Sequence, residues 1–147
     1  MRSLRIGIAT ICIGIGISAH AQVPTLSGRF AGTGRACFGS LSVQSKTITW
    51  STPFSQCIRL PYETVEQDTS SHNTRFTFSF KRQPAGCRYR IITITHDGGH
   101  DDRTGWQVTG YGQEHSYLAD KANGYNSDAL DIMSCYLVRE SNKNSNP

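Results

Sequence analysis

The sequence lacks the strong net charge that a nucleic-acid-binding protein usually carries. It contains 15 lysines and arginines against 11 aspartates and glutamates. Arg2 and Arg5 precede an apolar N-terminal run, so 13 basic residues remain after that run, against the same 11 acidic ones. An electrostatic footprint on a polyanionic backbone needs a larger excess of basic residues. We therefore expect no nucleic-acid partner.

Long apolar runs are also missing. The run IGIATICIGIGIS after Arg5 is interrupted by glycines and is shorter than the ~20 residues that a membrane-spanning helix requires. Arg2 and Arg5 before it and Ala19-His20-Ala21 after it are typical of a secretory signal peptide cleaved after Ala21. A membrane anchor is the weaker alternative. We predict a signal peptide over residues 1–21 and a periplasmic or secreted protein that does not span the membrane.

Closely spaced cysteines are absent as well. Removal of Cys12 with the leader leaves four cysteines, at positions 37, 57, 87 and 135. A zinc site usually contains a C-x₂₋₄-C pair, and no such pair occurs here. An even number of cysteines in a short exported chain instead predicts two disulfides.

Helical periodicity is scarce, whereas strand patterns are abundant. No convincing amphipathic helix follows the leader, and we expect at most one short helical turn around Tyr117 to Ala122. In TRFTFSFK, residues 74–81, three phenylalanines alternate with polar residues. This period of two predicts a strand with one buried face and one solvated face.

Further segments alternate in the same way or are rich in β-branched residues. They span residues 37–43, 46–50, 57–62, 87–96, 105–112 and 132–139. We expect Pro61 to bend or end its strand, and the polar stretch EQDTSSHN to form a loop.

These segments predict an all-β protein, a small antiparallel barrel or sandwich of seven to eight strands. It would occupy residues 22–140 as a single domain, followed by a flexible tail over residues 141–147. A barrel is favoured over a sandwich because closure leaves no unpaired strand edge in so small a domain.

The alternation also favours one disulfide pairing among the three that four cysteines allow. Cys37 shares an apolar face with its neighbours in the first strong strand, and Cys135 does so in the last. Pairing them leaves Cys57 and Cys87, each at the start of a predicted strand, where a bridge is geometrically easy. We therefore expect Cys37–Cys135 and Cys57–Cys87.

The stretch HDGGHDD, residues 96–102, contains the weak candidates for a metal site: His96, His100, Asp101 and Asp102. It lies between two predicted strands, and Asp-Gly-Gly tolerates the positive φ angles of a hairpin connection. Nothing in a Gly-Gly loop presets the geometry of two imidazoles, and the calcium-loop spacing is missing. We interpret the stretch as a plain turn and expect no metal or other cofactor.

Signals of catalysis are weak. Glu114, His115 and Ser116 place an acid, a base and a nucleophile side by side, but adjacent residues of a strand point to opposite faces. The glycine-rich stretch 28–39 lacks a following helix that would bind phosphate, so its glycines are better explained by a sharply bent strand.

A group of basic residues is the strongest candidate for a binding surface. It consists of Arg75, Lys81, Arg82, Arg88 and Arg90. They fall in two segments that we expect to be neighbouring strands, with the basic side chains outward. A solvated sheet face is the simple explanation. The functional alternative is a docking surface for an acidic protein or another anionic component of the cell envelope.

Together these observations predict an exported, non-enzymatic binding protein of the inhibitor or accessory type. A carrier that holds a small apolar ligand in the barrel is the alternative, and a hydrolytic enzyme is a remote one. The phenylalanine stripe favours a filled interior and so argues against the carrier. With cysteines in its first and last strands, the predicted architecture is similar to that of small periplasmic inhibitor barrels that block host enzymes such as lysozyme. Because no extended motif is shared, the resemblance is one of architecture alone.

Overall fold

The fold is taken from a computed structural model, in which residues 25–70 and 72–141 are described. The predicted signal peptide and residues 142–147 of the predicted tail lie outside the described residues.

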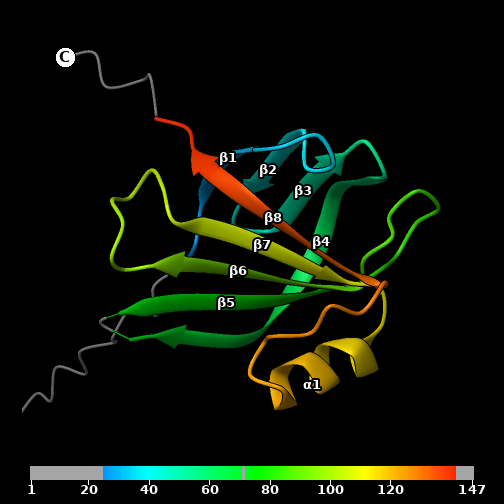
Figure 1. The fold of residues 1–147 in the computed structure, drawn as a ribbon. Coiled ribbons are helices and arrows are strands. Elements are labelled where there is room, and N and C mark those ends of the chain that lie inside the picture. The colour runs from blue at the N-terminus through cyan, green and yellow to red at the C-terminus, as the bar shows by residue number, and fades with distance from the viewer. Residues whose placement is uncertain (1–24, 71, 142–147) are drawn as a thin grey trace, which may run out of the picture.

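The described chain forms a closed antiparallel barrel of eight strands (Figure 1). The strands are β1 (Gly28–Gly32), β2 (Gly39–Val43), β3 (Thr47–Thr52), β4 (Ser55–Thr69), β5 (Asn73–Phe80), β6 (Ile91–Asp97), β7 (Trp106–Tyr111) and β8 (Ile132–Arg139). Each strand pairs with the next in sequence, and β1 pairs with β8 to close the barrel. The expected all-β fold is confirmed, and closure distinguishes the barrel from the sandwich.

Because the strands run up and down in turn, the connections gather at two ends. We call apical the end that holds the β1–β2, β3–β4, β5–β6 and β7–β8 connections. The basal end holds the other three connections, the start of β1 and the end of β8 (Figure 1).

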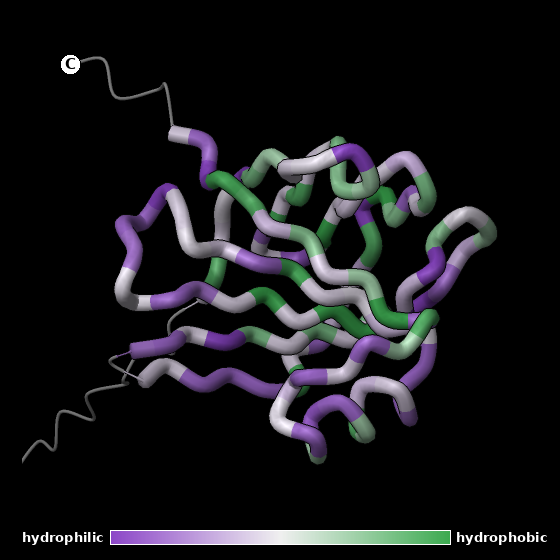
Figure 2. The backbone as a smooth tube through the Cα atoms, viewed as in Figure 1, coloured by the Kyte–Doolittle hydropathy of each residue, from purple (hydrophilic) through white to green (hydrophobic). Residues whose placement is uncertain are grey.

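Strand β4 is longer than the sequence predicts. It runs through Pro61, pairing with β3 over residues 55–61 and with β5 over residues 62–69. The missing N–H of the proline is tolerated because Pro61 lies where the partner strand changes. The prediction of a loop over residues 66–73 is therefore wrong for most of the stretch. Its polar side chains belong to the solvated end of the β4–β5 hairpin, where the second half of β4 is coloured mostly as hydrophilic (Figure 2).

The prediction of one strand over residues 87–96 needs a similar correction. Strand β6 starts only at Ile91, and residues 87–90 form an irregular segment at the apical end. The Arg90 N–H donates to Tyr111 O and the Arg90 carbonyl accepts from Phe80 N, so this segment still joins β5 to β7. The sequence does not distinguish it from a strand because Cys87 and Tyr89 alternate inward as strand residues would.

Two disulfides brace the barrel, Cys37–Cys135 and Cys57–Cys87. These are the pairs that the alternation of the strands favours. Gly32 shows how tightly the chain bends near the first bond, since a Cβ atom there would lie 1.9 Å from the Cys37 carbonyl oxygen. Disulfides of this kind are typical of proteins outside the reducing cytosol.

Helix α1 (Glu114–Ala122) connects β7 to β8 and is longer than the single turn expected. It packs against the outside of the barrel, where Tyr117 forms a small second core with Ile91 and Tyr111. Thr77 of the phenylalanine strand, expected on a solvated face, is fully buried. The outer face of the barrel is thus partly covered.

Candidate functional site

The barrel interior is filled by protein side chains. Trp50 stacks on Tyr89 with ring centroids 4.5 Å apart. Both rings occupy the space beside Gly110, where a Cβ atom would lie 2.6 Å from each of them. Gly110 therefore makes room for aromatic rings of the protein, although an inward glycine is also what a ligand cavity would use.

The five basic residues singled out in the sequence do not form one face. Lys81, Arg82, Arg88 and Arg90 are all exposed in the β5–β6 connection at the apical end. Arg75 lies apart on β5, half-buried, with its guanidinium carbon 3.6 Å from the centre of the Tyr125 ring. The expected sheet face is wrong because residues 87–90 are not in a strand and the α1–β8 connection covers Arg75. The role of the five basic residues in binding stays a prediction.

Of the five basic residues, Arg88 lines an apical hollow of about 230 Å³. Each of the four apical connections contributes to its lining, through Ala36, Phe54, Arg88 and Leu130. Phe54 is 59% exposed and Leu130 is fully exposed. Sequence analysis identifies Arg88 but misses the two apolar residues, because only closure of the barrel brings the three connections together.

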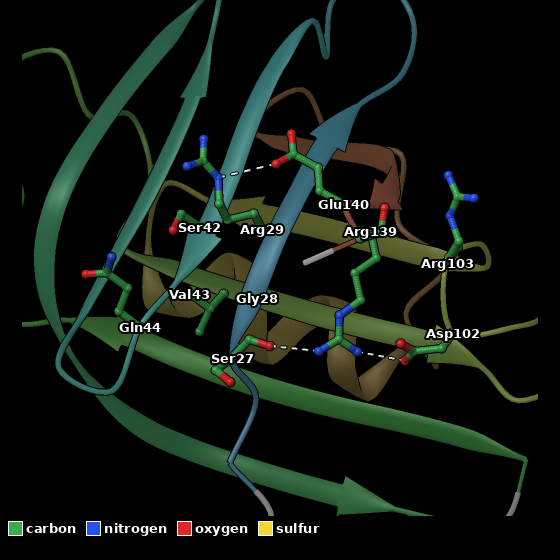
Figure 3. A pocket seen from close by; sticks show the side chains of 11 residues that line it. Ser27, Gly28, Arg29, Ser42, Val43, Gln44, Asp102, Arg103, Arg139 and Glu140 are labelled. Carbon is green, nitrogen blue, oxygen red and sulfur yellow. Dashed lines mark hydrogen bonds and ion pairs between the residues drawn. The ribbon is translucent and has the colours of Figure 1, made fainter. Parts of the chain in front are cut away.

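The basal end carries a larger cleft of about 570 Å³ (Figure 3). Arg139 crosses it, donating to Ser27 O at 2.9 Å and to Asp102 Oδ1 at 2.7 Å. The same guanidinium lies over the rings of Phe30 and Trp106. Arg29 pairs with Glu140 at the other side of the cleft. Most charged side chains of the basal cleft are therefore paired with one another across this end of the barrel.

The charged stretch at residues 96–102 ends β6 and begins the β6–β7 connection, also at the basal end. His96 lies against Trp106, with ring centroids 4.5 Å apart, and its Nε2 is 3.0 Å from Asp101 O. His100 Nε2 is 3.8 Å from Asp97 Oδ2. Within residues 25–70 and 72–141, no group of three or more His, Cys, Asp or Glu side chains is placed to hold a metal ion.

The carboxylate of Asp101 is used by the turn itself. Its Oδ1 accepts hydrogen bonds from the N–H groups of Arg103 and Thr104 and from the Thr104 hydroxyl. These bonds stabilise the charged form and lower the pKa of Asp101. Asp102 is engaged with Arg139, as described for the basal cleft. The geometry supports the interpretation of this stretch as a turn.

Glu114, His115 and Ser116 lie in the first turn of α1. The expectation that they point to opposite faces of a strand is therefore wrong. Successive helical residues nevertheless point in different directions, and the three do not converge. Glu114 and His115 are exposed, whereas the buried Ser116 donates a hydrogen bond to Asp131. Ser116 therefore anchors the helix to the segment before β8.

Two further polar contacts hold α1 against the barrel, and sequence analysis misses both. Tyr111 donates to Asp120 Oδ2 at 2.7 Å, and burial together with this bond raises the pKa of Tyr111. Tyr117 and Lys121 both donate to Glu66 Oε2, at 2.7 and 2.6 Å. These two bonds lower the pKa of Glu66. Only the three-dimensional placement of a nine-residue helix brings these side chains together.

No protein-family model matches this chain, and comparisons with curated proteins and with solved structures gave no significant match. The described ranges contain no helix with the length and apolar character that a membrane crossing requires.

Proposed function

We propose that this chain is an exported, non-enzymatic binding protein, periplasmic or secreted, whose apical end docks an acidic protein. The observation that carries the proposal is the apical hollow, where Arg88 lies with the exposed side chains of Phe54 and Leu130. Single exposed apolar residues need no explanation, but two of them around one hollow beside an arginine are typical of an interface.

The composition of the apical hollow supports a protein partner. Aromatic residues and arginine are enriched among the residues that contribute most to protein–protein affinity, especially where they surround a pocket. Phe38, 77% exposed beside the Cys37–Cys135 disulfide, adds a further aromatic ring at this end. The disulfides also fix two of the four apical connections, β1–β2 through Cys37 and β5–β6 through Cys87, which reduces the entropy lost on docking.

Charge supports an acidic partner. Lys81 pairs with Glu63 at 3.3 Å, but Arg82, Arg88 and Arg90 form no ion pair within the described ranges. Asp131, the acidic residue in the lining, already accepts a hydrogen bond from Ser116. A partner with an acidic surface would be attracted to the remaining positive charge and would associate faster at low salt.

The same geometry gives less support to the two alternatives, a small-ligand carrier and a hydrolase. A carrier needs space inside the barrel, and the stacked rings of Trp50 and Tyr89 fill the place where the inward Gly110 would offer it. A hydrolase needs converging catalytic groups, and Glu114, His115 and Ser116 do not converge.

The test starts with capture of a partner by the oxidised protein from envelope extract or host fluid, followed by affinity measurement with the purified partner. Arg88→Glu and Leu130→Ser should each raise the Kd at least tenfold, a loss of about 1.4 kcal/mol. Binding should also weaken as salt increases.

Val65→Ser is the matched control, because Val65 is 52% exposed on β4 and lies outside the lining of the apical hollow. It should leave the Kd unchanged. The proposal fails if no partner is captured, if Val65→Ser weakens binding as much as Leu130→Ser, or if binding is independent of salt.

A further inference from the structure

The outer face of β5–β8 carries rows of side chains that run across the four strands. One row is Ser79, Ile91, Tyr111 and Ile132, which is mostly apolar and lies towards α1. The next is Thr77, Thr93, Thr109 and Ser134, in which every residue has a hydroxyl group. The third is Arg75, Thr95, Gln107 and Tyr136. Polarity thus increases with distance from the helix.

Two adjoining hollows lie over these polar rows, with volumes of about 200 and 400 Å³. They share Arg75, Thr95 and Gln107 in their linings, so together they form one outer groove. The α1–β8 connection walls one part of it through Tyr125, and Tyr136 lines the other. In Figure 1 α1 lies beside the apical part of these strands and leaves their basal part uncovered.

Polar groups in the outer groove are only partly satisfied by the protein. Thr109 hydrogen-bonds to Ser134 at 2.9 Å. By contrast, Arg75 Nε and Tyr125 Oη are buried and have no hydrogen-bond partner within the described ranges. The Arg75 guanidinium stacks on the Tyr125 ring, so these two atoms lie under the wall of the groove, and a ligand would meet the more exposed side chains of the lining.

The charge of the outer groove disfavours an anionic ligand. Arg75 is its one arginine, and it lies opposite Asp68 in the β4–β5 register. Asp97 lines the groove near its basal end, and Asp120 of α1 lines it near its apical end. The acidic residues therefore offset the guanidinium, and attraction for a phosphate or carboxylate group is weak.

The remaining lining matches the chemistry of a sugar. Threonine, serine and glutamine side chains both donate and accept hydrogen bonds, as sugar hydroxyls do. Tyr136 is 70% exposed and offers a flat ring on which the C–H face of a sugar ring can pack. We propose that the outer groove is a saccharide-binding site that takes a short neutral oligosaccharide. This site is separate from the apical docking surface.

The test is calorimetric titration of the oxidised protein with three neutral tetrasaccharides, built from α-glucose, β-glucose and N-acetylglucosamine, and with a tetragalacturonate as the anionic comparison. At least one neutral tetrasaccharide should bind. Gln107→Ala and Tyr136→Ala should each raise its Kd at least tenfold, and amide shifts in NMR spectra should cluster on β5–β8.

Thr109→Val and Thr47→Val form a matched pair. Each removes the hydroxyl of a half-buried strand threonine that bonds to one neighbouring side chain, but only Thr109 lines the outer groove. Thr109→Val should weaken binding, whereas Thr47→Val should not. Thermal melting confirms that each variant is folded.

The proposal is overturned if none of the neutral tetrasaccharides binds at millimolar concentration, if only the galacturonate binds, or if the groove variants leave the Kd unchanged. Arg88→Glu separates the two proposals. It should weaken docking of a protein partner at least tenfold and leave saccharide binding intact, so that either proposal can fail without the other.

Discussion

The two faces of strands β5–β8 differ in how completely they are covered. Their inner face contributes Phe76, Ile94, Val108 and Cys135 in a single row, all of them buried. The adjacent outer row consists of hydroxyl residues, of which Thr77 and Thr93 are buried and Ser134 is exposed. Closure of the barrel buries the middle of the inner face, whereas α1 and the connection that follows it cover only part of the outer face.

This difference separates the residues that contribute to folding stability from those that are available for binding. Apolar burial inside the barrel is the main source of stability, since each large side chain removed from water contributes a few kcal/mol. The outer face gains less from burial and retains polar groups that can meet a ligand. Stability and binding are thus separated on opposite sides of the same strands.

The largest effect is expected from Trp50→Ala on the inner face. Removal of this fully buried indole should lower the free energy of unfolding by about 3–5 kcal/mol, because it leaves a cavity next to Tyr89. Urea denaturation measures the change. Tyr136→Ala, on the exposed outer row, should change the stability by less than about 0.5 kcal/mol. Equal losses in the two variants would contradict the distinction between the faces.

An intermediate effect is expected where α1 covers the outer face. Tyr111→Phe removes the hydroxyl that donates to the buried carboxylate of Asp120, which should cost about 1–3 kcal/mol of stability. Tyr62→Phe is the matched control, because the Tyr62 hydroxyl donates to Gln44 O at an exposed position. Urea denaturation should show a smaller loss for the control. If Tyr62→Phe is the more damaging change, the helix does not depend on this bond.

The smallest effect is expected from acid, through the contact of Glu66 with Tyr117 and Lys121. The pKa of Glu66 is lowered in the folded state, so its contribution to stability is complete above the unfolded-state pKa. That contribution disappears as the pH falls through the folded-state pKa, below the ordinary value of 4.5. Melting temperatures recorded from neutral pH to about pH 3 measure the loss.

Glu66→Gln should therefore flatten the acid side of this melting profile. Glu114→Gln is the control, since this exposed carboxylate forms no ion pair within residues 25–70 and 72–141. If the profile of Glu66→Gln follows that of the unmodified protein, the contact contributes nothing to acid stability.

Much of the barrel could be predicted from local pattern. The alternation around Phe76, Phe78 and Phe80 correctly indicates the inner face of β5, and the same reasoning turns Cys37 and Cys135 inward. The length of β4 could not be predicted, because Pro61 and the polar residues after it are typical of a loop. Their strand conformation depends on β3 and β5, which lie on either side of it.

The candidate sites were less predictable than the fold. The charge of Arg88 marks it as a candidate in the sequence. Phe54 and Leu130, by contrast, are isolated apolar residues in loops far apart in the sequence. Similarly, Thr95 and Gln107 are ordinary outward residues until Arg75 and Tyr136 are placed beside them by the register. A site assembled from several strands leaves no local motif.

The sequence alone determines which side chains face the interior of the barrel. A period of two assigns apolar side chains to one face of each strand, wherever that strand is placed in the fold. The outer side depends on contacts between distant segments. Only the folded chain decides that Tyr117 of α1 contacts Thr77, that Arg75 lies on Tyr125, and that four apical connections meet around one hollow. Burial preference is a local property of the sequence, whereas the meeting of loops and registers is set by the closure of the whole barrel.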